Sequence, residues 1–572
     1  MSVATGSIQA AFCATLIDEL ERAGVTDAVV SPGSRSTPLA LAIAGSSLRM
    51  HVRLDERSAC FVAVGLARTT QRPVLVLVTS GTAAAELLAG VVEAQLDRVP
   101  LIVATADRPP ELHGIGAAQT IEQRGIFGPH VLSAIDPGPV HALPPSSWRP
   151  IASRLVHDAL TGPCAGPVAI NLPFVEPLVA EPGPVPPGRS GGRPWYSTAP
   201  GAKTSAVELA VGGRGVIVAG QGAGSSDLVL GAARRLGWPV LADPRSGLSS
   251  SDRCVVTVAD TIVRDDRLAA TMRPETILIA GAPPASKVLA GWIDDAAAAG
   301  AELVLLGGDG LHRHPSQLAA LVVPGPADHL WPRLRPGGVP DDPSWLGRWS
   351  ALQGAIDSTF AQALDDPAWN EPAVVRTIAQ LDAASTIVAS SSMPIRDLEW
   401  FGGTRPRPPV IHANRGANGI DGVVSTAMGV ALGSPGPVVA IVGDLAFLHD
   451  VSSLVEGLGE GDQGSLTIVV LDNGGGGIFS FLPQRSSVPA EAFARLFTTQ
   501  RSPRPEAVAA GFGLRSHVVA DAGSLRTRLA ESVGSAGISV IVCQLPDHDS
   551  NVEVHARLVA DAVAAARAAV GV

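Results

Sequence analysis

The sequence predicts an α/β protein with three domains, each built around a mainly parallel β-sheet flanked by helices. Apolar, β-branched runs that end at Gly or Asp alternate with helix-like runs along the chain, which is typical of buried parallel strands. The length of 572 residues exceeds what one hydrophobic core normally serves. Two stretches rich in Pro and Gly, at about Pro177 to Lys203 and Val323 to Trp345, resemble linkers. We therefore expect domains at residues 1–180, 204–325 and 347–572.

The composition restricts the class of function. Hydrophobic residues make up 46% of the chain and charged residues 17%, which is typical of a globular protein with large buried sheets. The net charge is −11 and no dense basic run occurs, so binding to nucleic acid or to an anionic membrane is disfavoured. No apolar run reaches the roughly 18 residues that a membrane-spanning helix needs. Anionic small molecules remain possible ligands, because a local arginine cluster can oppose the overall charge.

The N-terminal segment and the cysteines predict a cytoplasmic protein. Residues 1–22 carry three acidic side chains in an amphipathic helical pattern, unlike the basic start and apolar core of a signal peptide. The five cysteines are odd in number and widely spaced, and none forms a Cys-x-x-Cys pair. We interpret them as buried free thiols in a reducing compartment.

In the first domain, polar residues follow the expected strands. Strands are expected at residues 28–30, 51–54, 73–80 and 99–105, with a helix over 58–68. The loops after these strands contain Ser34 and Arg35, then Glu56, and later Arg108 and Gln119. Ligands of open parallel sheets bind outside the carboxyl ends of the strands, so these loops are candidate binding segments.

The middle domain contains a turn that is similar to a dinucleotide fingerprint. The strand 216–219 enters the turn Gly220-Gln221-Gly222-Ala223-Gly224, and Asp243 ends the next strand. The third glycine falls one position early, with Ser225 where it should stand. We therefore prefer a nucleotide-type fold with an empty or adapted site over an NAD or FAD site.

The third domain repeats the pattern of the first. Strands are expected at 386–389, 410–413, 438–442 and 466–471. The segment that begins at Pro437 matches the one that begins at Pro73, 364 residues earlier, in its strand, helical run and second strand. The loops after the first two strands contain Ser392 and Arg396, and then Arg415 and Asn418.

The last two of these strands lead into the most informative residues of the chain. One runs into Gly443-Asp444, and the other into Asp472-Asn473-Gly474-Gly475, 29 positions after the first. Asp444 and Asn473 should therefore lie side by side at one edge of the sheet. A carboxylate, an amide oxygen and a glycine carbonyl suit Mg²⁺ bound together with phosphate. The glycines would let backbone N–H groups approach a diphosphate.

These two turns resemble the metal–diphosphate motif of thiamine diphosphate enzymes, Gly-Asp-Gly followed one strand later by Asn-Asn. Leu445 replaces the third residue of the motif, and Asp472 replaces the first Asn. The metal-binding positions remain as Asp444, Asn473 and the carbonyl of Gly475. The alternative interpretation is two ordinary turns rich in Gly and Asp.

Thiamine diphosphate enzymes also place a carboxylate of the first domain against the aminopyrimidine ring of the cofactor. Glu56 is our candidate, because it stands at a strand-to-helix junction as in that family. Burial against an apolar ring should raise its pKa, which suits proton exchange near neutral pH. Alternatively, Asp55 and Glu56 only cap the helix and complement its dipole.

Arginines at strand ends predict a substrate with several carboxylates. Arg35, Arg108, Arg396 and Arg415 each follow an expected strand. Guanidinium groups bind carboxylates through two hydrogen bonds, so four of them on one face of the sheets would bind a polyanionic set of substrates. Taken singly, each arginine also suits a surface ion pair.

Longer sequence strings narrow the resemblance to one family. They occur in family order between residues 31 and 483 and read SPGSRSTPL, DERSA, TSGTAA, TADRPPEL, SSMPIRDLE, NRGANGIDGVVSTAMGVAL, GDLAFLHD and DNGGGGIFSFLP. They resemble the 2-succinyl-5-enolpyruvyl-6-hydroxy-3-cyclohexene-1-carboxylate synthase family of menaquinone biosynthesis. The match covers both cofactor-binding domains, whereas the middle domain adds only Ala285-Ser286-Lys287.

The resemblance implies a reaction and a set of roles. The reaction is decarboxylation of 2-oxoglutarate with thiamine diphosphate and Mg²⁺ or Mn²⁺, followed by 1,4-addition of the succinyl-semialdehyde carbanion to isochorismate. Cofactor-binding positions would be Glu56, Arg415, Asn418, Gly443, Asp444, Asn473, Gly475 and Ile478. Substrate-binding positions would be Ser34, Arg35, Arg108, Gln119, Lys287, Ser392, Arg396, Phe479 and Leu482. Val288 follows Lys287 where some members carry an Arg, so one carboxylate contact is expected to be absent or to come from elsewhere.

The family also clasps its cofactor between the first domain of one subunit and the third domain of another, which implies a homodimer or a dimer of dimers. Two alternatives stay open: another thiamine lyase, such as an acetohydroxyacid-synthase-like enzyme that uses pyruvate, and a non-catalytic nucleotide-binding protein with the same fold. Four arginines fit a dicarboxylate donor better than pyruvate, and the altered middle-domain turn disfavours FAD. Glu56, Asp444 and Asn473 count against a non-catalytic protein.

Overall fold

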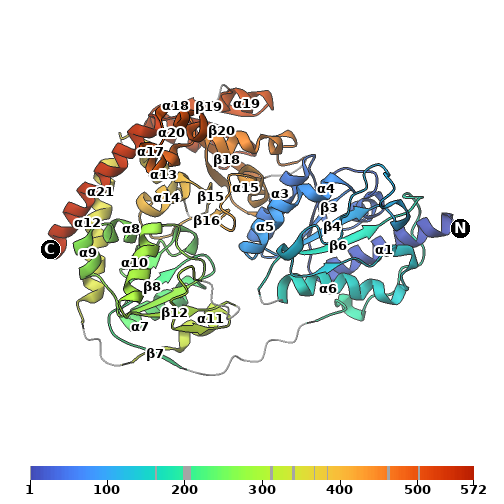
Figure 1. The fold of residues 1–572 in the computed structure, drawn as a ribbon, viewed down its shortest axis with the longest axis horizontal. Helices are drawn as coiled ribbons and strands as arrows, with labels where there is room; N and C mark the ends of the chain where they lie inside the picture. The colour runs from blue at the N-terminus through green and yellow to red at the C-terminus, as the bar shows by residue number, and fades with distance from the viewer. Residues whose placement is uncertain are drawn as a thin grey trace.

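Three six-stranded sheets, one after another along the chain, form the framework of the molecule (Figure 1). The computed structural model describes residues 2–161, 164–197, 208–308, 314–337, 342–365, 367–382, 384–459, 464–499 and 503–572. All strand pairs of these sheets are parallel and helices flank the sheets, which confirms the predicted α/β class. The limits of the three domains stay a prediction.

The first sheet, blue to cyan in Figure 1, is covered by helices on both faces. In spatial order its strands are β2 (Arg49–Val52), β1 (Asp27–Val30), β3 (Val74–Val78), β4 (Leu101–Asp107), β6 (Val168–Pro173) and β5 (Ala134–Ile135). One face packs against α1 (Ser2–Arg22), α2 (Thr37–Ala44) and α6 (Trp148–Thr161), and the other against α3 (Glu56–Thr70), α4 (Thr82–Glu86) and α5 (Leu88–Leu96). Alternate residues of β3 enter the two cores, as the pleat of a strand requires.

The third sheet has the same strand order as the first. Its strands are β16 (Val410–Ala413), β15 (Thr386–Ala389), β17 (Val438–Gly443), β18 (Ser465–Asp472), β20 (Gly537–Gln544) and β19 (Arg515–Val519). Its helices are α13 (Glu371–Ala379), α14 (Met393–Phe401) and α20 (Ala522–Ser532) on one face, and α15 (Val423–Gly433), α16 (Asp444–His449) and α19 (Pro505–Gly511) on the other. Shorter helices α17 (Gln484–Ser487) and α18 (Ala490–Phe493) and the long C-terminal helix α21 (His548–Val570) complete this part. The shared order confirms the internal repeat.

Helices α3 and α15 occupy equivalent places in the two copies and pack directly on each other, between the two sheets (Figure 1). They approach so closely because a glycine stands at the contact on each side. A Cβ added to Gly65 would lie 2.2 Å from the carbonyl oxygen of Thr426, and one added to Gly429 would lie 2.0 Å from that of Val62. Gly429 follows Gly65 by the same interval as Val438 follows Val74, so the contact is reciprocal. The first and third domains thus share one continuous apolar core.

The middle sheet has a different strand order. Its strands are β10 (Val255–Val256), β9 (Val240–Ala242), β8 (Gly215–Ala219), β11 (Thr276–Ala280), β12 (Glu302–Leu306) and β13 (Leu321–Val323), and β7 (Leu209–Val211) pairs with β14 (Leu334–Pro336) beside it. Its helices are α7 (Ser226–Leu236), α8 (Ala259–Val263), α9 (Asp266–Thr271), α10 (Lys287–Ala298) and α11 (Ala327–Leu330). Helix α12 (Trp345–Leu364), after the second linker, joins this core, where the rings of Trp345 and Trp292 both contact Trp349.

In the middle domain, two side chains of the protein contact the glycine-rich turn at the place where a cofactor phosphate would bind. The backbone N–H of Ser225, at the start of α7, donates to the Asp328 carboxylate at 2.6 Å, and Trp331 donates its indole N–H to the carbonyl of Ala223 at 2.7 Å. Asp243, which ends the neighbouring strand, is paired with Arg245 at 2.9 Å. A cofactor phosphate would meet the Asp328 carboxylate at this helix terminus, because both anions require the same N–H groups. These contacts favour the adapted-site interpretation.

The cysteines and helices bear on two further expectations. All five cysteines are free thiols, and four of them are buried, whereas Cys164 is partly exposed. Within the described ranges, no helix combines the length and the apolar character that crossing a bilayer requires.

Candidate active site

The predicted metal-binding residues meet at the carboxyl ends of two neighbouring strands. Strands β17 and β18 pair in parallel with Gly443 opposite Leu471, so Asp444 and Asn473 emerge from the same sheet edge. The Asp444 carboxylate accepts the N–H of Leu445 at 2.7 Å and also that of Gly475. Burial and the neighbouring Asp472 raise the pKa of Asp444 to about 7, against the lowering effect of these N–H groups.

In the side-chain amide of Asn473, the nitrogen has a hydrogen-bond partner and the oxygen has none among the described residues. Its Nδ2 donates to Glu371 at 3.1 Å, whereas its buried Oδ1 has no hydrogen-bond partner in the described part of the chain. Gly475 has φ of +135°, and a Cβ there would lie 2.1 Å from the carbonyl oxygen of Thr498, so only glycine fits. A carboxylate, an orphaned amide oxygen and a glycine thus stand together, and this donor set fits a hard cation such as Mg²⁺.

Glu56 is the first residue of α3 and is half-buried. The strand before it spans Arg49–Val52 and not the predicted 51–54, because Asp55 caps the helix by accepting the N–H of Ser58 and the chain leaves the sheet earlier. The cap interpretation therefore holds for Asp55, whose side chain also accepts from Ser452 at 2.6 Å. Among the described residues, no hydrogen bond or ion pair joins Glu56 to Asp444 or Asn473.

The loop with Arg415 and Asn418 is fastened by the first domain of the same chain. Glu93, a buried residue of α5, accepts the backbone N–H groups of Gly416 at 2.9 Å and of Ala417 at 2.7 Å. Burial raises the pKa of Glu93, although these two N–H groups act in the opposite direction. A carboxylate that accepts two successive N–H groups fixes the path of the loop.

Arg415 and Arg396 lie in one positively charged cluster. Burial, together with the charges of Arg245 and Arg396, lowers the pKa of Arg415 to about 10. Arg396 donates to the carbonyl of Ser392 at 2.5 Å. The start of α10, where Lys287 is exposed, is joined to the helix of Arg396 because the N–H of Ser286 donates to Glu399 at 3.3 Å. Arg396 and Arg415 thus lie near each other, and the start of α10 is attached to the helix of Arg396.

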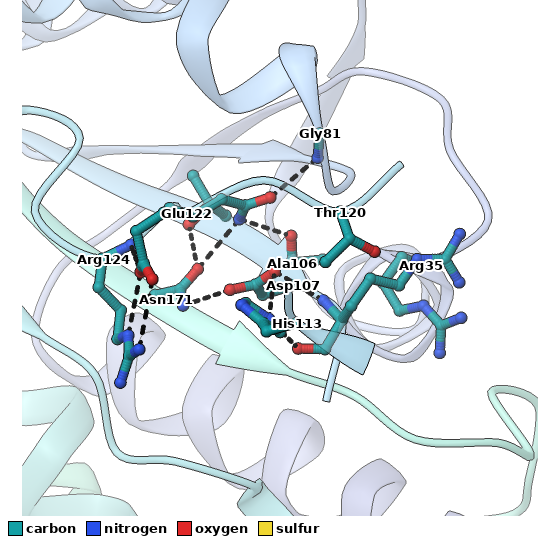
Figure 2. A network of polar contacts seen from close by, with 12 residues as sticks. Arg35, Gly81, Ala106, Asp107, His113, Thr120, Glu122, Arg124 and Asn171 are labelled. Atoms are coloured by element: carbon teal, nitrogen blue, oxygen red, sulfur yellow. Dashed lines mark hydrogen bonds and ion pairs between the residues drawn. The ribbon is translucent and has the colours of Figure 1, made fainter. Parts of the chain in front are cut away.

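Arg35 and Arg108 stand in the loops that follow β1 and β4. Figure 2 shows the polar network beside Arg35, with Asp107 between Asn171 and His113. Asn171 donates to Asp107 at 2.8 Å, and the N–H of Arg108 donates to the same carboxylate at 2.7 Å. Burial raises the pKa of Asp107. No described contact links Arg35 or Arg108 to Arg396 or Arg415, so the expected convergence of the four arginines stays a prediction.

The backbone is strained at three predicted site residues. Seven non-glycine residues of the described chain have positive φ, and Gln119 (52°), Ser392 (77°) and Asn418 (63°) are among them. Such conformations are costly and gather at functional sites, so this coincidence supports the assignment. Gln119 is exposed beside Gly81, in a segment held by Gln123, which accepts the N–H of Gly81 at 2.8 Å. Ser34 is likewise exposed in its loop.

The predicted apolar wall lies on the short helical segment 477–481 and just beyond it. Ile478, Phe479 and Leu482 are each half-buried rather than enclosed in a core. The ring of Phe479 contacts that of Phe497 at 5.3 Å. Partial exposure leaves apolar surface available beside the metal-binding residues, as a cofactor ring would require.

Several buried polar residues around the site carried no signal that sequence analysis used. Glu93, Glu371 and Asn171 each contact a predicted site segment from a distant part of the chain, and Gln123 accepts from Gly81, which lies beside Gln119. Glu371 in particular resembles an ordinary helix start, Asn370-Glu371-Pro372, in which Asn370 is the cap. Asp107, which accepts from Asn171, could have been found, because it belongs to the string TADRPPEL.

Family models of thiamine enzymes match three successive regions of the chain. They are described as "Thiamine pyrophosphate enzyme, N-terminal TPP binding domain" over residues 12–126, "Middle domain of thiamine pyrophosphate" over 192–388 and "Thiamine pyrophosphate enzyme, C-terminal TPP binding domain" over 403–543. The first and third regions contain the two sheets of equal strand order.

Curated relatives match nearly the whole chain. A 2-succinyl-5-enolpyruvyl-6-hydroxy-3-cyclohexene-1-carboxylate synthase of Geobacillus thermodenitrificans is 38% identical, covering 95% of this chain and 94% of its own. A protein of the same name from Chloroflexus aurantiacus is 41% identical, covering 85% of this chain and 85% of its own. Another, from Myxococcus xanthus, is 37% identical, covering 95% of this chain and 96% of its own. The chain therefore belongs to the 2-succinyl-5-enolpyruvyl-6-hydroxy-3-cyclohexene-1-carboxylate synthase family of thiamine diphosphate-dependent enzymes.

Proposed function

We propose that this enzyme decarboxylates 2-oxoglutarate and adds the succinyl-semialdehyde unit in 1,4 fashion to isochorismate, releasing CO₂. The observation that carries the proposal is the set of cationic donors at strand ends, because both substrates are dicarboxylates. Arg108 has a buried Nε without a hydrogen-bond partner in the described chain, so this side chain keeps donor capacity for a ligand. The names of the relatives support the same reaction.

Asp444, the Oδ1 of Asn473 and the carbonyl of Gly475 would hold Mg²⁺, or Mn²⁺, between the protein and the cofactor diphosphate. The orphaned Oδ1 of Asn473 supports this role, because a buried acceptor without a partner is costly unless a ligand completes it. Arg415 and Asn418 would lie near the diphosphate, where the clamp of Glu93 on their loop limits movement.

When bound, thiamine diphosphate supplies the electron sink that decarboxylation of a 2-oxo acid requires. The protein has three tasks around it. Glu56 would hold and exchange a proton at the aminopyrimidine ring. Ile478, Phe479 and Leu482 would exclude water from the reacting carbon, because their exposed surfaces are apolar. Ser34, Arg35, Arg108, Gln119, Lys287, Ser392 and Arg396 would bind carboxylates and hydroxyls of the two substrates.

The site is proposed to be completed by a second copy of the chain. Within one chain, α3 and α15 bring the first and third domains together, yet Glu56 makes no described contact with Asp444 or Asn473. Beside Glu56, Arg57 donates instead to the carbonyl of His449, at 3.1 Å. A homodimer, or a dimer of dimers, would allow Glu56 of one subunit to serve the metal site of the other.

The test of the proposed function is consumption of isochorismate by the purified protein with thiamine diphosphate and Mg²⁺. Loss of isochorismate that depends on both 2-oxoglutarate and the cofactor is the expected result. If isochorismate persists while pyruvate or another 2-oxo acid is decarboxylated, the enzyme is a different thiamine lyase. If no 2-oxo acid is consumed at all, the catalytic proposal fails.

Affinity for Mg²⁺ should fall as the pH is lowered through about 7. The pKa of Asp444 is raised to about 7 from 3.8, so this ligand becomes protonated below that pH and a proton competes with the metal. One competing proton gives a loss of about tenfold in affinity for each pH unit below the pKa. Calorimetric titration of Mg²⁺ between pH 5.5 and 8 measures it.

Asp472→Asn provides the control for this pH dependence. The charge of Asp472 contributes to the raised pKa of Asp444, so its removal should move the midpoint to lower pH. An affinity that is constant across the range in the parent enzyme would contradict the role of Asp444. An unchanged midpoint in the variant would contradict the role of Asp472.

A further inference from the structure

A buried carboxyl group stands directly behind the proposed metal ligand Asn473. Glu371, the first residue of α13, is 3% exposed, and its Oε2 accepts the Nδ2 of Asn473 at 3.1 Å. The amide of Asn473 is packed against Gly477, where an added Cβ would lie 2.7 Å from Nδ2. The side chain is therefore confined on the side of its nitrogen, and its oxygen remains without a partner in the described chain.

Glu371 is itself held in place by the C-terminal helix. Asn551 of α21 donates to the same Oε2 at 2.8 Å. On the next turn of α21, His555 donates its Nδ1–H to the backbone carbonyl of Asn551 and pairs through Nε2 with buried Asp397, each at 2.8 Å. Two amide groups from segments distant in sequence, those of Asn473 and Asn551, thus donate to one oxygen of Glu371, and this acceptor has little freedom to move.

The two ends of an asparagine side chain differ in what they offer a cation. The oxygen is a ligand, whereas the NH₂ group presents hydrogens and repels the ion. A fixed acceptor that holds the nitrogen therefore selects the rotamer in which the oxygen is free. Such contacts behind a ligand commonly change metal affinity by about 10- to 100-fold when they are removed.

We propose that Glu371 is a positioning residue for the metal centre: by accepting the Nδ2–H of Asn473, it turns the amide so that Oδ1 faces the cation. The inference rests on the metal site proposed above. It requires an acceptor oxygen at the length of a glutamate side chain and does not require a negative charge. Glutamine, whose carbonyl oxygen can occupy the same place, should therefore replace glutamate, whereas the shorter aspartate should not.

The test compares Glu371→Gln with Glu371→Asp in the full-length protein loaded with thiamine diphosphate. Titration calorimetry with Mg²⁺ and electron paramagnetic resonance with Mn²⁺ both report binding without turnover. The expected result is an affinity within about threefold of the parent for glutamine and a loss of about 10-fold or more for aspartate. Both substitutions keep the site filled, and the melting temperature of each variant shows that it is folded.

The possible outcomes distinguish a failure of the role of Glu371 from a failure of the proposed metal site. Parent-like affinity in the aspartate variant overturns the inference, because the acceptor has been withdrawn without consequence. Weak binding in the glutamine variant also overturns it, because charge rather than orientation then matters. Asp444→Asn should abolish binding. If the parent protein itself shows no saturable Mg²⁺ binding, or Asp444→Asn binds normally, the metal site fails and not the role of Glu371 alone.

Discussion

Replacing Glu56 by glutamine should lower turnover by about 10²- to 10⁴-fold while thiamine diphosphate and Mg²⁺ still bind. Glutamine keeps the size of the side chain and a hydrogen bond to the aminopyrimidine ring, but it does not exchange a proton with it. Glu56 starts α3 and no other described residue pairs with it, so the substitution should leave the fold intact. The rate of isochorismate consumption, with cofactor affinity measured by calorimetry, gives the two quantities.

The neighbouring carboxylate provides the matched control. Asp55→Asn changes an acid one position away, yet asparagine also caps helices well, so turnover should stay near that of the parent. Full activity of Glu56→Gln would remove Glu56 from the mechanism. Co-expression of Glu56→Gln with Asp444→Asn, each inactive alone, should restore about a quarter of parental activity, since mixed dimers would contain one intact site. No recovery in isolated mixed dimers would contradict a site shared between subunits.

The second large effect is expected at the contact between α3 and α15, where Gly429→Ala should destabilise the enzyme by about 3 kcal/mol. The new Cβ would lie 2.0 Å from the carbonyl oxygen of Val62, an atom of a helix backbone that has no other rotamer to adopt. The helices must separate, and the packing between the two domains is lost. Differential scanning calorimetry should show that the melting temperature of the packed first and third domains is lowered by roughly 6–12 °C.

A glycine in open space separates this clash from the general effect of adding a methyl group. Gly354 lies within α12, and an added Cβ there meets nothing within 4 Å. Gly354→Ala should therefore be neutral or stabilising by up to about 1 kcal/mol, because alanine favours helix. A melting temperature of Gly429→Ala equal to that of the parent would mean that the two helices can part without cost.

The positions of the strands were the most predictable feature of this protein. The expected strands at 386–389 and 410–413 are observed with the same limits, because both are short runs rich in apolar and β-branched residues. The strand before Glu56 was placed two residues late. Its true start is set by pairing with β1, where Asp27 lies opposite Arg49 and bonds to its side chain, a contact between distant segments.

The supporting residues of the site were beyond sequence reasoning for the same reason. Glu93 contacts the loop of Arg415, which lies more than half of the chain away in sequence. Glu371 contacts Asn551, and no local sequence pattern predicts that these two distant segments meet. Their segments resemble ordinary helices. The candidate metal-binding residues, in contrast, follow a rule that can be applied to a local sequence, because binding residues stand where parallel strands end. Asp444 and Asn473 were predicted by that rule.

The glycine contact between α3 and α15 also has a consequence for how the chain is made. On the ribosome, α3 is complete more than 350 residues before α15 exists, and at about 5–20 residues per second the wait is roughly 20–70 s. During that time the apolar face of α3 has no partner, and the equivalent helix of another chain offers the same glycine surface. Nascent chains should therefore need chaperone protection at this helix, and exchange of third domains between chains is the expected form of misassembly.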